Sequence, residues 1–396
     1  MFRLSQFIDL CLREPSGDLD LPQGPLRMRG PVVIWNLIRR CNLTCRHCYT
    51  TSADIDFQGE LSTREVLEVM EDLWAHGVRV LILSGGEPLL RPDLHQIART
   101  AKSMGFYTGL SSNGTLITPE TIGEIEKTGF DYVGVSLDGL RATHDHFRQQ
   151  PGSFEASLAG VRLCRSHGIR IGIRMTLTQS NAQELPAILE LMEEEGVDKF
   201  YLSHLNYGGR GLRHRDGDAA HEVTRKAMDL LFEMTYKKLK AGHSFEIVTG
   251  NNDADGAYLL MWVQQRFPDH VPLIRAHLRR WGGNASGINV ANIDNLGEVH
   301  PDTFWWHYPL GNVRDRPFSE IWSNAEDPLM LGLRQHPRPI KGRCAKCQYL
   351  ELCNGNTRVR AHQTLGDFWA EDPGCYLSDA EIGIEGFQSE GQVGSG

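Results

Sequence analysis

Residues 32–49 read VVIWNLIRRCNLTCRHCY, and this stretch decides the fold. Its first part, residues 32–38, is an apolar run rich in β-branched residues, which predicts a strand. Three cysteines follow with C-x3-C-x2-C spacing, Cys41, Cys45 and Cys48. A structural [4Fe–4S] cluster takes four cysteine ligands, so three on one loop leave one iron open to a small molecule. A zinc knuckle is the alternative that this spacing alone leaves open.

A second unit of strand and loop follows about 40 residues later. Residues 78–84, VRVLILS, predict another strand, and Gly85, Gly86 and Glu87 come directly after it. Paired glycines let the backbone approach a ligand closely, and the Glu87 carboxylate suits an ammonium group. Loops that follow parallel strands meet at one edge of a sheet, so we expect this segment to share a site with the cysteine loop.

Strands and helices alternate from residue 32 to about residue 240. The predicted strands are 32–38, 78–83, 106–111, 131–137, 169–177 and 197–204, and the predicted helices are 61–77, 92–104, 119–128, 154–167, 182–195 and 219–239. Repeated βα units require parallel strands with right-handed crossovers. Six units are too few for an eight-stranded barrel. The expected fold is therefore α/β, a partial (β/α)6 TIM-like barrel followed by a small α+β domain.

Polar residues stand at further strand ends, at the mouth of this expected barrel. They are Ser112, Asn113, Ser136, Asp138 and Arg174. Hydroxyl, amide and carboxylate groups suit a ribose, and a guanidinium suits a carboxylate. The alternative is that Asn113-Gly114 and Asp138-Gly139 are turn residues.

A second group of cysteines lies near the C-terminus. Cys344, Cys347 and Cys353 have C-x2-C-x5-C spacing, and Cys375 follows them. Four thiolates complete either a tetrahedral zinc site or a fully ligated [4Fe–4S] cluster.

The cysteine loop followed by GGEP resembles the signature of the radical S-adenosylmethionine (SAM) superfamily. The resemblance implies that Cys41, Cys45 and Cys48 hold a catalytic [4Fe–4S] cluster. It also implies that the strand-end residues bind SAM, namely Gly85, Gly86, Glu87, Ser112, Asn113, Ser136, Asp138 and Arg174. The C-terminal cysteines resemble a SPASM/Twitch-type domain, which implies a second [4Fe–4S] cluster on Cys344, Cys347, Cys353 and Cys375.

Residues 35–49, 299–322 and 344–377 resemble the radical SAM proteins of heme d1 biosynthesis, the NirJ family. That resemblance implies an iron tetrapyrrole substrate, 12,18-didecarboxysiroheme, whose propionate side chains are removed or converted after hydrogen abstraction by an adenosyl radical. It also implies a reducing electron donor such as ferredoxin or flavodoxin. The alternatives are a heme-pathway decarboxylase acting on siroheme or iron-coproporphyrin, and a peptide-modifying SPASM enzyme.

Two segments suit a large flat anion of this kind. The loop 206–218, NYGGRGLRHRDGD, carries arginines and His214, and residues 304–308, FWWHY, form an aromatic bridge before the second group of cysteines. Cations bind carboxylates and aromatic faces stack on a macrocycle. His214 and His307 are candidate ligands for the substrate iron. A solvated loop and an interdomain core are the respective alternatives.

Composition sets the remaining bounds. The net charge of −9 over 396 residues argues against nucleic acid as a bulk partner, and no apolar stretch approaches the ~18 residues that a membrane span needs. Nine cysteines, mostly clustered, fit metal binding in a reducing cytoplasm. The predicted organisation is an N-terminal helix and linker (1–30), the barrel (31–240), a bridging segment with the second cluster domain (241–380), and a disordered tail (381–396).

Overall fold

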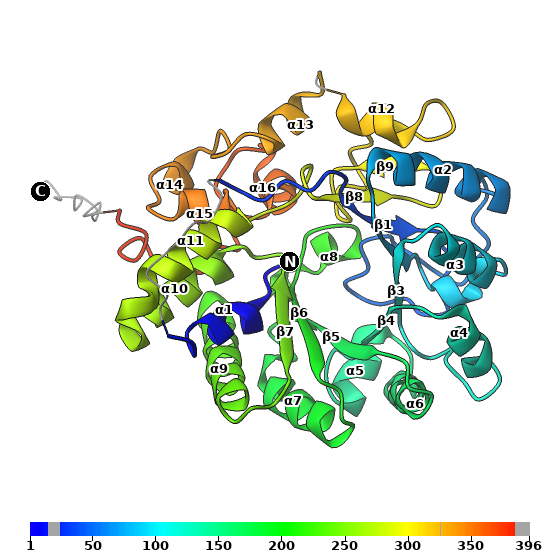
Figure 1. Ribbon diagram of the computed structural model, residues 1–396, viewed down its shortest axis with the longest axis horizontal. Coiled ribbons are helices and arrows are strands. Elements are labelled where there is room, and N and C mark those ends of the chain that lie inside the picture. The colour runs from blue at the N-terminus through cyan, green and yellow to red at the C-terminus, as the bar shows by residue number, and fades with distance from the viewer. Residues whose placement is uncertain (15–23, 325, 385–396) are drawn as a thin grey trace, which may run out of the picture.

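The computed structural model describes residues 1–14, 24–324 and 326–384. Within them a ten-stranded sheet runs in the order β10-β9-β8-β1-β2-β3-β4-β5-β6-β7 (Figure 1). The strands are β1 (Val32–Asn36), β2 (Val80–Ser84), β3 (Tyr107–Ser112), β4 (Tyr132–Ser136), β5 (Ile171–Leu177), β6 (Lys199–His204), β7 (Glu246–Gly250), β8 (Val290–Ile293), β9 (Glu298–His300) and β10 (Gly311–Asn312). All pairs from β8 to β7 are parallel, and β9 and β10 are antiparallel. The α/β partial barrel is confirmed.

The six predicted strands are β1 to β6, and their ends differ from the prediction by at most two residues. The structure adds β7 beyond β6 and β8 beyond β1. A hairpin before the second group of cysteines, β8–β9, extends the barrel sheet directly. One sheet therefore contains strands from both sides of residue 240.

The helices in the described residues are α1 (Leu4–Leu10), α2 (Thr63–His76), α3 (Leu94–Ser103), α4 (Ile122–Thr128), α5 (Arg141–Arg148), α6 (Ser153–Ser166), α7 (Leu185–Glu194), α8 (Arg210–Arg213), α9 (His221–Lys240), α10 (Ala254–Arg266), α11 (Val271–Trp281), α12 (Phe318–Ser323), α13 (Pro328–Leu333), α14 (Gly342–Ala345), α15 (Leu350–Cys353) and α16 (Arg358–Leu365). The six predicted helices are α2, α3, α4, α6, α7 and α9. Helix α2 begins at a capping box of Ser62 and Glu65 and ends at a left-handed Gly77, as its sequence predicts. Helix α5 was not predicted.

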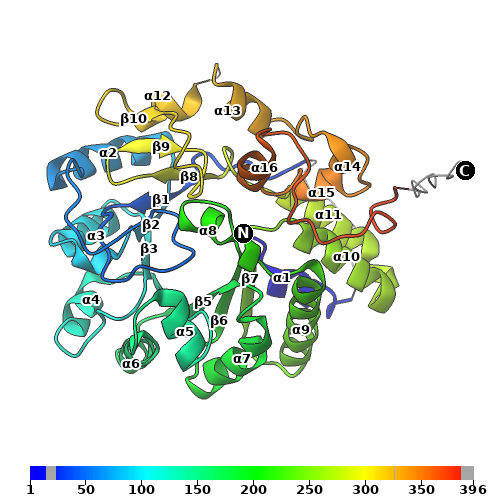
Figure 2. The same cartoon turned by 180° about the vertical axis from the view of Figure 1, so that it is seen from behind.

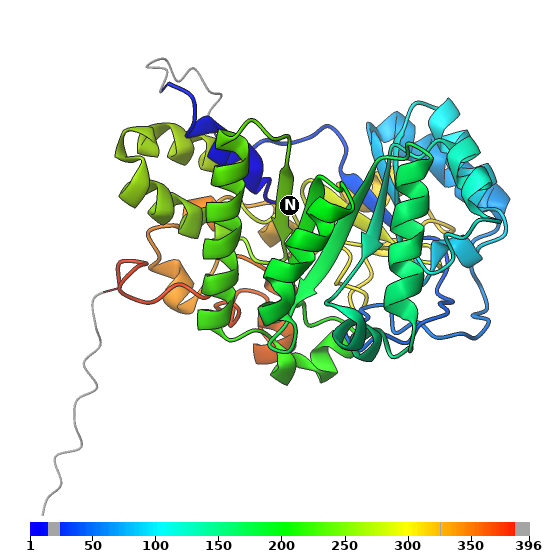
Figure 3. The same ribbon diagram turned by 90° about the horizontal axis from the view of Figure 1, so that it is seen from below.

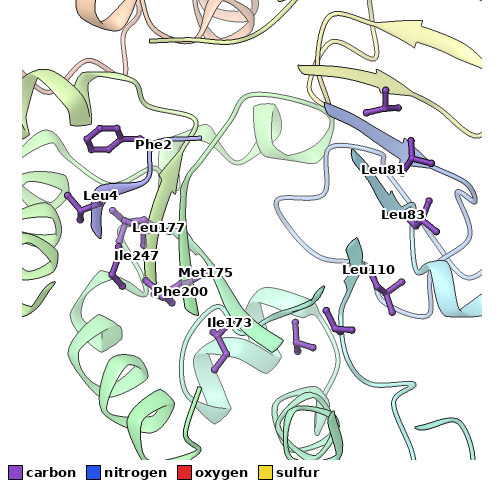
Figure 4. Packing of buried hydrophobic residues seen from close by; sticks show 14 of the residues in the cluster. Phe2, Leu4, Leu81, Leu83, Leu110, Ile173, Met175, Leu177, Phe200 and Ile247 are labelled. Atoms are coloured by element: carbon purple, nitrogen blue, oxygen red, sulfur yellow. The ribbon is translucent and has the colours of Figure 1, made fainter. Parts of the chain in front are cut away.

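The outer face of the sheet forms the main core. Side chains such as Leu81, Leu83, Leu110 and Ile173 point away from the barrel interior toward the covering helices (Figures 3 and 4). Each of these side chains is almost fully buried. Burial of such a side chain contributes about 1.5–3 kcal/mol, so this layer fixes the strand order.

The inner face of the sheet combines glycines and polar side chains with the rings of Tyr132 and Tyr201. Gly134 is on this face, where any larger residue would clash: a Cβ at that position would stand 2.9 Å from Cδ of Arg174. Ser136 and Arg174 are register partners on β4 and β5, and both are half-buried. The barrel interior therefore presents polar groups instead of a packed apolar core.

The N-terminal helix α1 packs against β7 and α9, and Phe2 forms an antiparallel bridge with Thr249 (Figure 2). Its apolar residues Leu4 and Ile8 are fully buried, which confirms the predicted amphipathic helix. Half of the predicted linker and most of the predicted tail, residues 15–23 and 385–396, lie outside the described residues. Among the described helices, none combines the length and the apolar character that crossing a bilayer requires.

Candidate active site

The cysteine loop places three thiols together at the C-terminal end of β1. Cys41 and Cys45 are buried, Cys48 is half-buried, and all three pack with Leu43. Burial raises the pKa of Cys41 to about 12. A thiol in this state becomes a thiolate only when a cation such as iron stands beside it, so the donor set fits an iron–sulfur cluster.

The glycine segment is bound to the start of the cysteine loop. The N–H of Gly86 donates to the carbonyl of Ile38 at 2.7 Å, and the N–H of Glu87 donates to the carbonyl of Arg40 at 2.9 Å. A Cβ on Gly85 would stand 2.3 Å from the Ile38 oxygen, and one on Gly86 would stand 2.2 Å from the Arg40 oxygen. These glycines therefore allow the backbone of residues 85–87 to pack closely against the start of the cysteine loop.

Glu87 connects this segment to the end of β3. Its buried carboxylate accepts hydrogen bonds from the Ser112 hydroxyl and from the Asn113 N–H, both at 2.8 Å. Burial raises the pKa of Glu87 to about 7. The Asn113 amide donates to Asn42 at 2.9 Å and lies 3.9 Å from Sγ of Cys41. The structure therefore brings the predicted residues of three loops together.

Arg174 and Ser136 lie on the inner face of the sheet beside this group. Arg174 donates to the hydroxyl of Ser111, and its guanidinium carbon lies 5.2 Å from the ring centre of Tyr201. Asp138 is placed differently. Its carboxylate is fully buried, accepts from the N–H of Thr176 at 2.7 Å and forms an ion pair with Arg148.

Two arginines that contact the cysteine loop have no local signal in the sequence. Arg148, at the end of α5, donates to Sγ of Cys45 at 3.6 Å. Arg210 was predicted as part of a substrate loop, but its guanidinium donates to the carbonyls of Cys45 at 2.7 Å and Ser52 at 2.9 Å. Its backbone N–H also donates to the Cys48 carbonyl at 2.9 Å. The loop after β6 therefore holds the cysteine loop in place.

The aromatic bridge lies next to the same loop. The rings of Phe304 and Trp306 are centred 5.3 and 6.1 Å from the ring of Tyr49, which directly follows Cys48. Trp305 is fully buried instead and packs on Phe368 at 5.7 Å. Trp305 is thus a core residue of the C-terminal part of the chain, whereas Phe304 and Trp306 belong to the surroundings of the cysteine loop.

The second group of cysteines surrounds a small cavity. Its lining includes all four thiols, Cys344, Cys347, Cys353 and Cys375. Burial raises the pKa of Cys344 to about 11 and that of Cys353 well above its ordinary value. These thiols also need a cation to ionise, so the cavity fits a metal centre.

Comparisons with known proteins agree with this geometry. Residues 35–192 match the sequence profile of the Radical SAM superfamily. The chain is 52% identical over 388 residues to pre-heme d1 synthase of Dinoroseobacter shibae, covering 97% of this chain and 94% of that protein. It is 44% identical to Fe-coproporphyrin III synthase of Methanosarcina barkeri, covering 90% of each.

Among solved structures, SuiB of Streptococcus suis bound to S-adenosylmethionine has the same fold. The TM-score is 0.68 at 14% identity, over 88% of this chain and 78% of SuiB. The profile match and the long, high-identity relatives settle the family. This chain belongs to the radical SAM superfamily, and it is an enzyme that uses SAM and a [4Fe–4S] cluster.

Proposed function

We propose that this enzyme acts in heme d1 biosynthesis, where it removes or converts the propionate side chains of 12,18-didecarboxysiroheme. The observation that carries the proposal is the meeting of three segments. The arginine-bearing loop after β6 and the aromatic bridge both contact the cysteine loop, at Cys48 and at Tyr49. High identity to a pre-heme d1 synthase over almost the whole chain supports the same substrate class.

In this proposal Cys41, Cys45 and Cys48 ligate the catalytic cluster. When cluster and SAM are bound, they supply an adenosyl radical that takes a hydrogen atom from the substrate. The protein positions the reacting groups. Gly85, Gly86 and Glu87, with Ser112, Asn113, Ser136 and Arg174, form the SAM surface, since all lie on loops or strands that end beside Cys41.

Glu87 anchors the SAM surface as well as lining it. Its carboxylate oxygens already accept from Ser112 and Asn113, so it fixes the end of β3 against the cysteine loop. Arg174, held along the inner sheet face by Ser111, offers a guanidinium to the methionine carboxylate. Burial of Cys41 and Cys45 keeps water from the cluster.

We assign tetrapyrrole binding to the outer part of the barrel opening, beyond the SAM surface. Arg213 and Arg215 are exposed and offer guanidinium groups to the tetrapyrrole carboxylates. Phe304 and Trp306 offer aromatic faces next to Tyr49. His214 is exposed beside the arginines, whereas His307 lies 3.0 Å from His362, nitrogen to nitrogen. Of the two, His214 is the better placed to reach a substrate iron.

We assign a second [4Fe–4S] cluster to Cys344, Cys347, Cys353 and Cys375. All four thiols line one small cavity, which supports a single metal centre there. The SPASM-type spacing of these cysteines favours an iron–sulfur cluster over a zinc ion, and such a cluster would exchange electrons with the substrate intermediate.

A heme-pathway decarboxylase is the second candidate. The relative named Fe-coproporphyrin III synthase is 44% identical over nine-tenths of each chain, so iron-coproporphyrin chemistry is a neighbouring activity. A peptide-modifying enzyme is less favoured, because the likeness to SuiB is one of fold at 14% identity.

The test is an anaerobic assay of cluster-reconstituted protein with SAM and dithionite. The enzyme is offered 12,18-didecarboxysiroheme, siroheme and iron-coproporphyrin separately, and 5′-deoxyadenosine and tetrapyrrole mass are measured together. We expect loss or conversion of propionates on didecarboxysiroheme alone. Mass change only on siroheme or iron-coproporphyrin would establish the second candidate, and 5′-deoxyadenosine with no tetrapyrrole change would overturn the substrate.

A further inference from the structure

We infer that Arg148 sets the reduction potential of the cluster on Cys41, Cys45 and Cys48, through an N–H···S hydrogen bond to Cys45, and that Asp138 holds Arg148 in place for this purpose. The inference rests on the proposed ligand role of these cysteines. It gives Asp138 a role different from the ribose contact that its position after β4 predicts.

The contact is built into the core. The Arg148 guanidinium donates from Nη1 to Sγ of Cys45 at 3.6 Å and forms an ion pair with Asp138 through Nη2. The side chains of Arg148 and Asp138 are 8% and 1% exposed. A buried guanidinium bound to a carboxylate on one side and a sulfur on the other has few alternative positions.

The backbone keeps α5 against the cysteine loop. The N–H of Arg46 donates to the carbonyl of Phe147 at 3.0 Å, and the ring of His47 stacks on that of Phe147 at 4.4 Å and 15°. These contacts flank Cys45 on its C-terminal side. They fix the distance between the Cys45 sulfur and Arg148, the next residue of α5.

Asp138 is itself held from three directions. Its carboxylate accepts from the Thr176 N–H at 2.7 Å, its carbonyl accepts from the Asn181 amide at 3.0 Å, and its N–H donates to Nδ1 of His144 at 3.1 Å. This arrangement points the carboxylate toward Arg148. The ion pair also compensates the charge of the buried guanidinium, which would be strongly unfavourable without a partner at this depth.

Among the side chains around the Cys45 sulfur, Arg148 is the charged one that donates a hydrogen bond to it. The rings nearby are engaged elsewhere, because His47 stacks on Phe147 and Nδ1 of His144 accepts from the N–H of Asp138. Arg210 binds the Cys45 carbonyl and not its sulfur. Reduction adds negative charge to a cluster and its thiolates. A hydrogen bond to a ligating sulfur stabilises that charge and raises the potential.

The second group of cysteines supplies a matched control. Arg343 lies beside the Cys375 thiol and forms an ion pair on its other side. Its ion-pair partner, Asp379, is 63% exposed, so solvent screens this guanidinium far more than Arg148. Substitution of Arg343 should therefore affect only the second cluster, and weakly.

The experiment is a potentiometric titration of the reconstituted enzyme, followed by EPR. The signal that changes when SAM is added identifies the cluster with the open iron. The first variant is the double substitution Arg148→Met with Asp138→Leu, which removes both charges and leaves no buried ion unpaired. The second is Arg148→Lys, which retains a charge but loses the fork that reaches both partners. Arg343→Gln is the control.

We expect the double variant to move the midpoint of the SAM-responsive cluster to a more negative potential and to leave the other cluster unchanged. Arg148→Lys should shift this midpoint potential in the same direction but by less. If the double variant does not bind iron, the test is made with Arg148→Lys. An unchanged midpoint at full iron content, or equal shifts of both clusters, would overturn the inference. Wild-type protein with no SAM-responsive signal would instead overturn the proposed cluster site.

Discussion

The two groups of cysteines are built in opposite ways. Cys41, Cys45 and Cys48 lie on one loop that follows β1, and hydrogen bonds from the loops after β2 and β6 hold it against a parallel sheet. Of the other four cysteines, three lie on or between the short helices α14 and α15, and Cys375 lies in the irregular segment after α16. The first site depends on strand order. The second depends on contacts between segments with little regular structure of their own.

Buried arginines stabilise the second site in place of a sheet. Arg338 is fully buried and donates to the carbonyls of Asn284 at 3.1 Å and Ser286 at 3.0 Å. Arg360 pairs with Asp372 at 2.7 Å, and both side chains are essentially inaccessible to water. Here guanidinium groups satisfy carbonyls that strands would otherwise pair. The comparison shows that one chain can build a thiol site from a rigid sheet or from a network of buried charges.

The largest contrast is expected from single cysteine substitutions. Cys45→Ala should abolish SAM cleavage, because two thiolates on a short loop cannot hold the catalytic cluster. Cys353→Ala should remove iron from the second site and leave reductive SAM cleavage measurable, since the first loop has its own supports. Iron content and 5′-deoxyadenosine formation without substrate measure this. Equal loss of SAM cleavage in both variants would show that the two sites are not independent.

Iron removal should expose the same contrast in stability. Helices of four to eight residues are marginal by themselves, so residues 342–365 depend on cross-linking by the cluster. The cysteine loop and the residues just before it keep their hydrogen bonds from Gly86, Glu87 and Arg210 without iron. After anaerobic chelation we expect hydrogen exchange to rise strongly at residues 342–365 and little in β1 to β6. Uniform exchange across both regions would contradict the comparison.

Breaking the Arg360–Asp372 pair should destabilise the C-terminal region by about 3–5 kcal/mol, because Arg360→Met leaves a carboxylate buried without a partner. Arg360 also donates to the carbonyl of Leu205 at 3.0 Å, at the end of β6, so the change loosens the region from the barrel. Denaturant unfolding measures the loss. The double variant Arg360→Met with Asp372→Leu is the control and should recover much of it. A double variant no more stable than the single would assign the loss to packing instead of charge.

The difference between local patterns and long-range contacts also explains which parts of the structure could be predicted from the sequence. The strands β1 to β6 could be predicted, since each is an apolar run that alternates with a helix, and the site loops follow from their C-terminal ends. Helix α5 could not, because its eight residues include only two apolar ones, Ala142 and Phe147, and it begins without a side-chain cap. Arg148 contacts Cys45 across 103 positions of sequence, and only the fold joins them. Asp138 was predicted to face the cofactor, but turn residues after a strand do not reveal which side the carboxylate takes.

The smallest effect concerns Glu381, which ties the segment after Cys375 to α9. Its carboxylate pairs with Arg225 at 2.6 Å, and this pair together with Ser378 lowers the pKa of Glu381 to about 2. A lowered carboxyl pKa stabilises the fold fully above the unfolded value of about 4.5 and loses this contribution as pH falls toward 2. The pair is partly exposed, so we expect Glu381→Gln to cost about 1 kcal/mol or less at pH 7.

That cost should shrink when thermal unfolding is measured at pH 4, because part of the unfolded chain is then protonated at Glu381 while the folded chain still carries the charge. Glu222→Gln, an exposed change on the same helix as Arg225, is the control and should shift the melting temperature little at either pH. A cost for Glu381→Gln that is equal at both pH values would mean that the side chain stabilises the segment by packing and neutral hydrogen bonds. The C-terminal site would then draw less of its stability from ion pairs, which narrows the contrast with the sheet-supported cysteine loop.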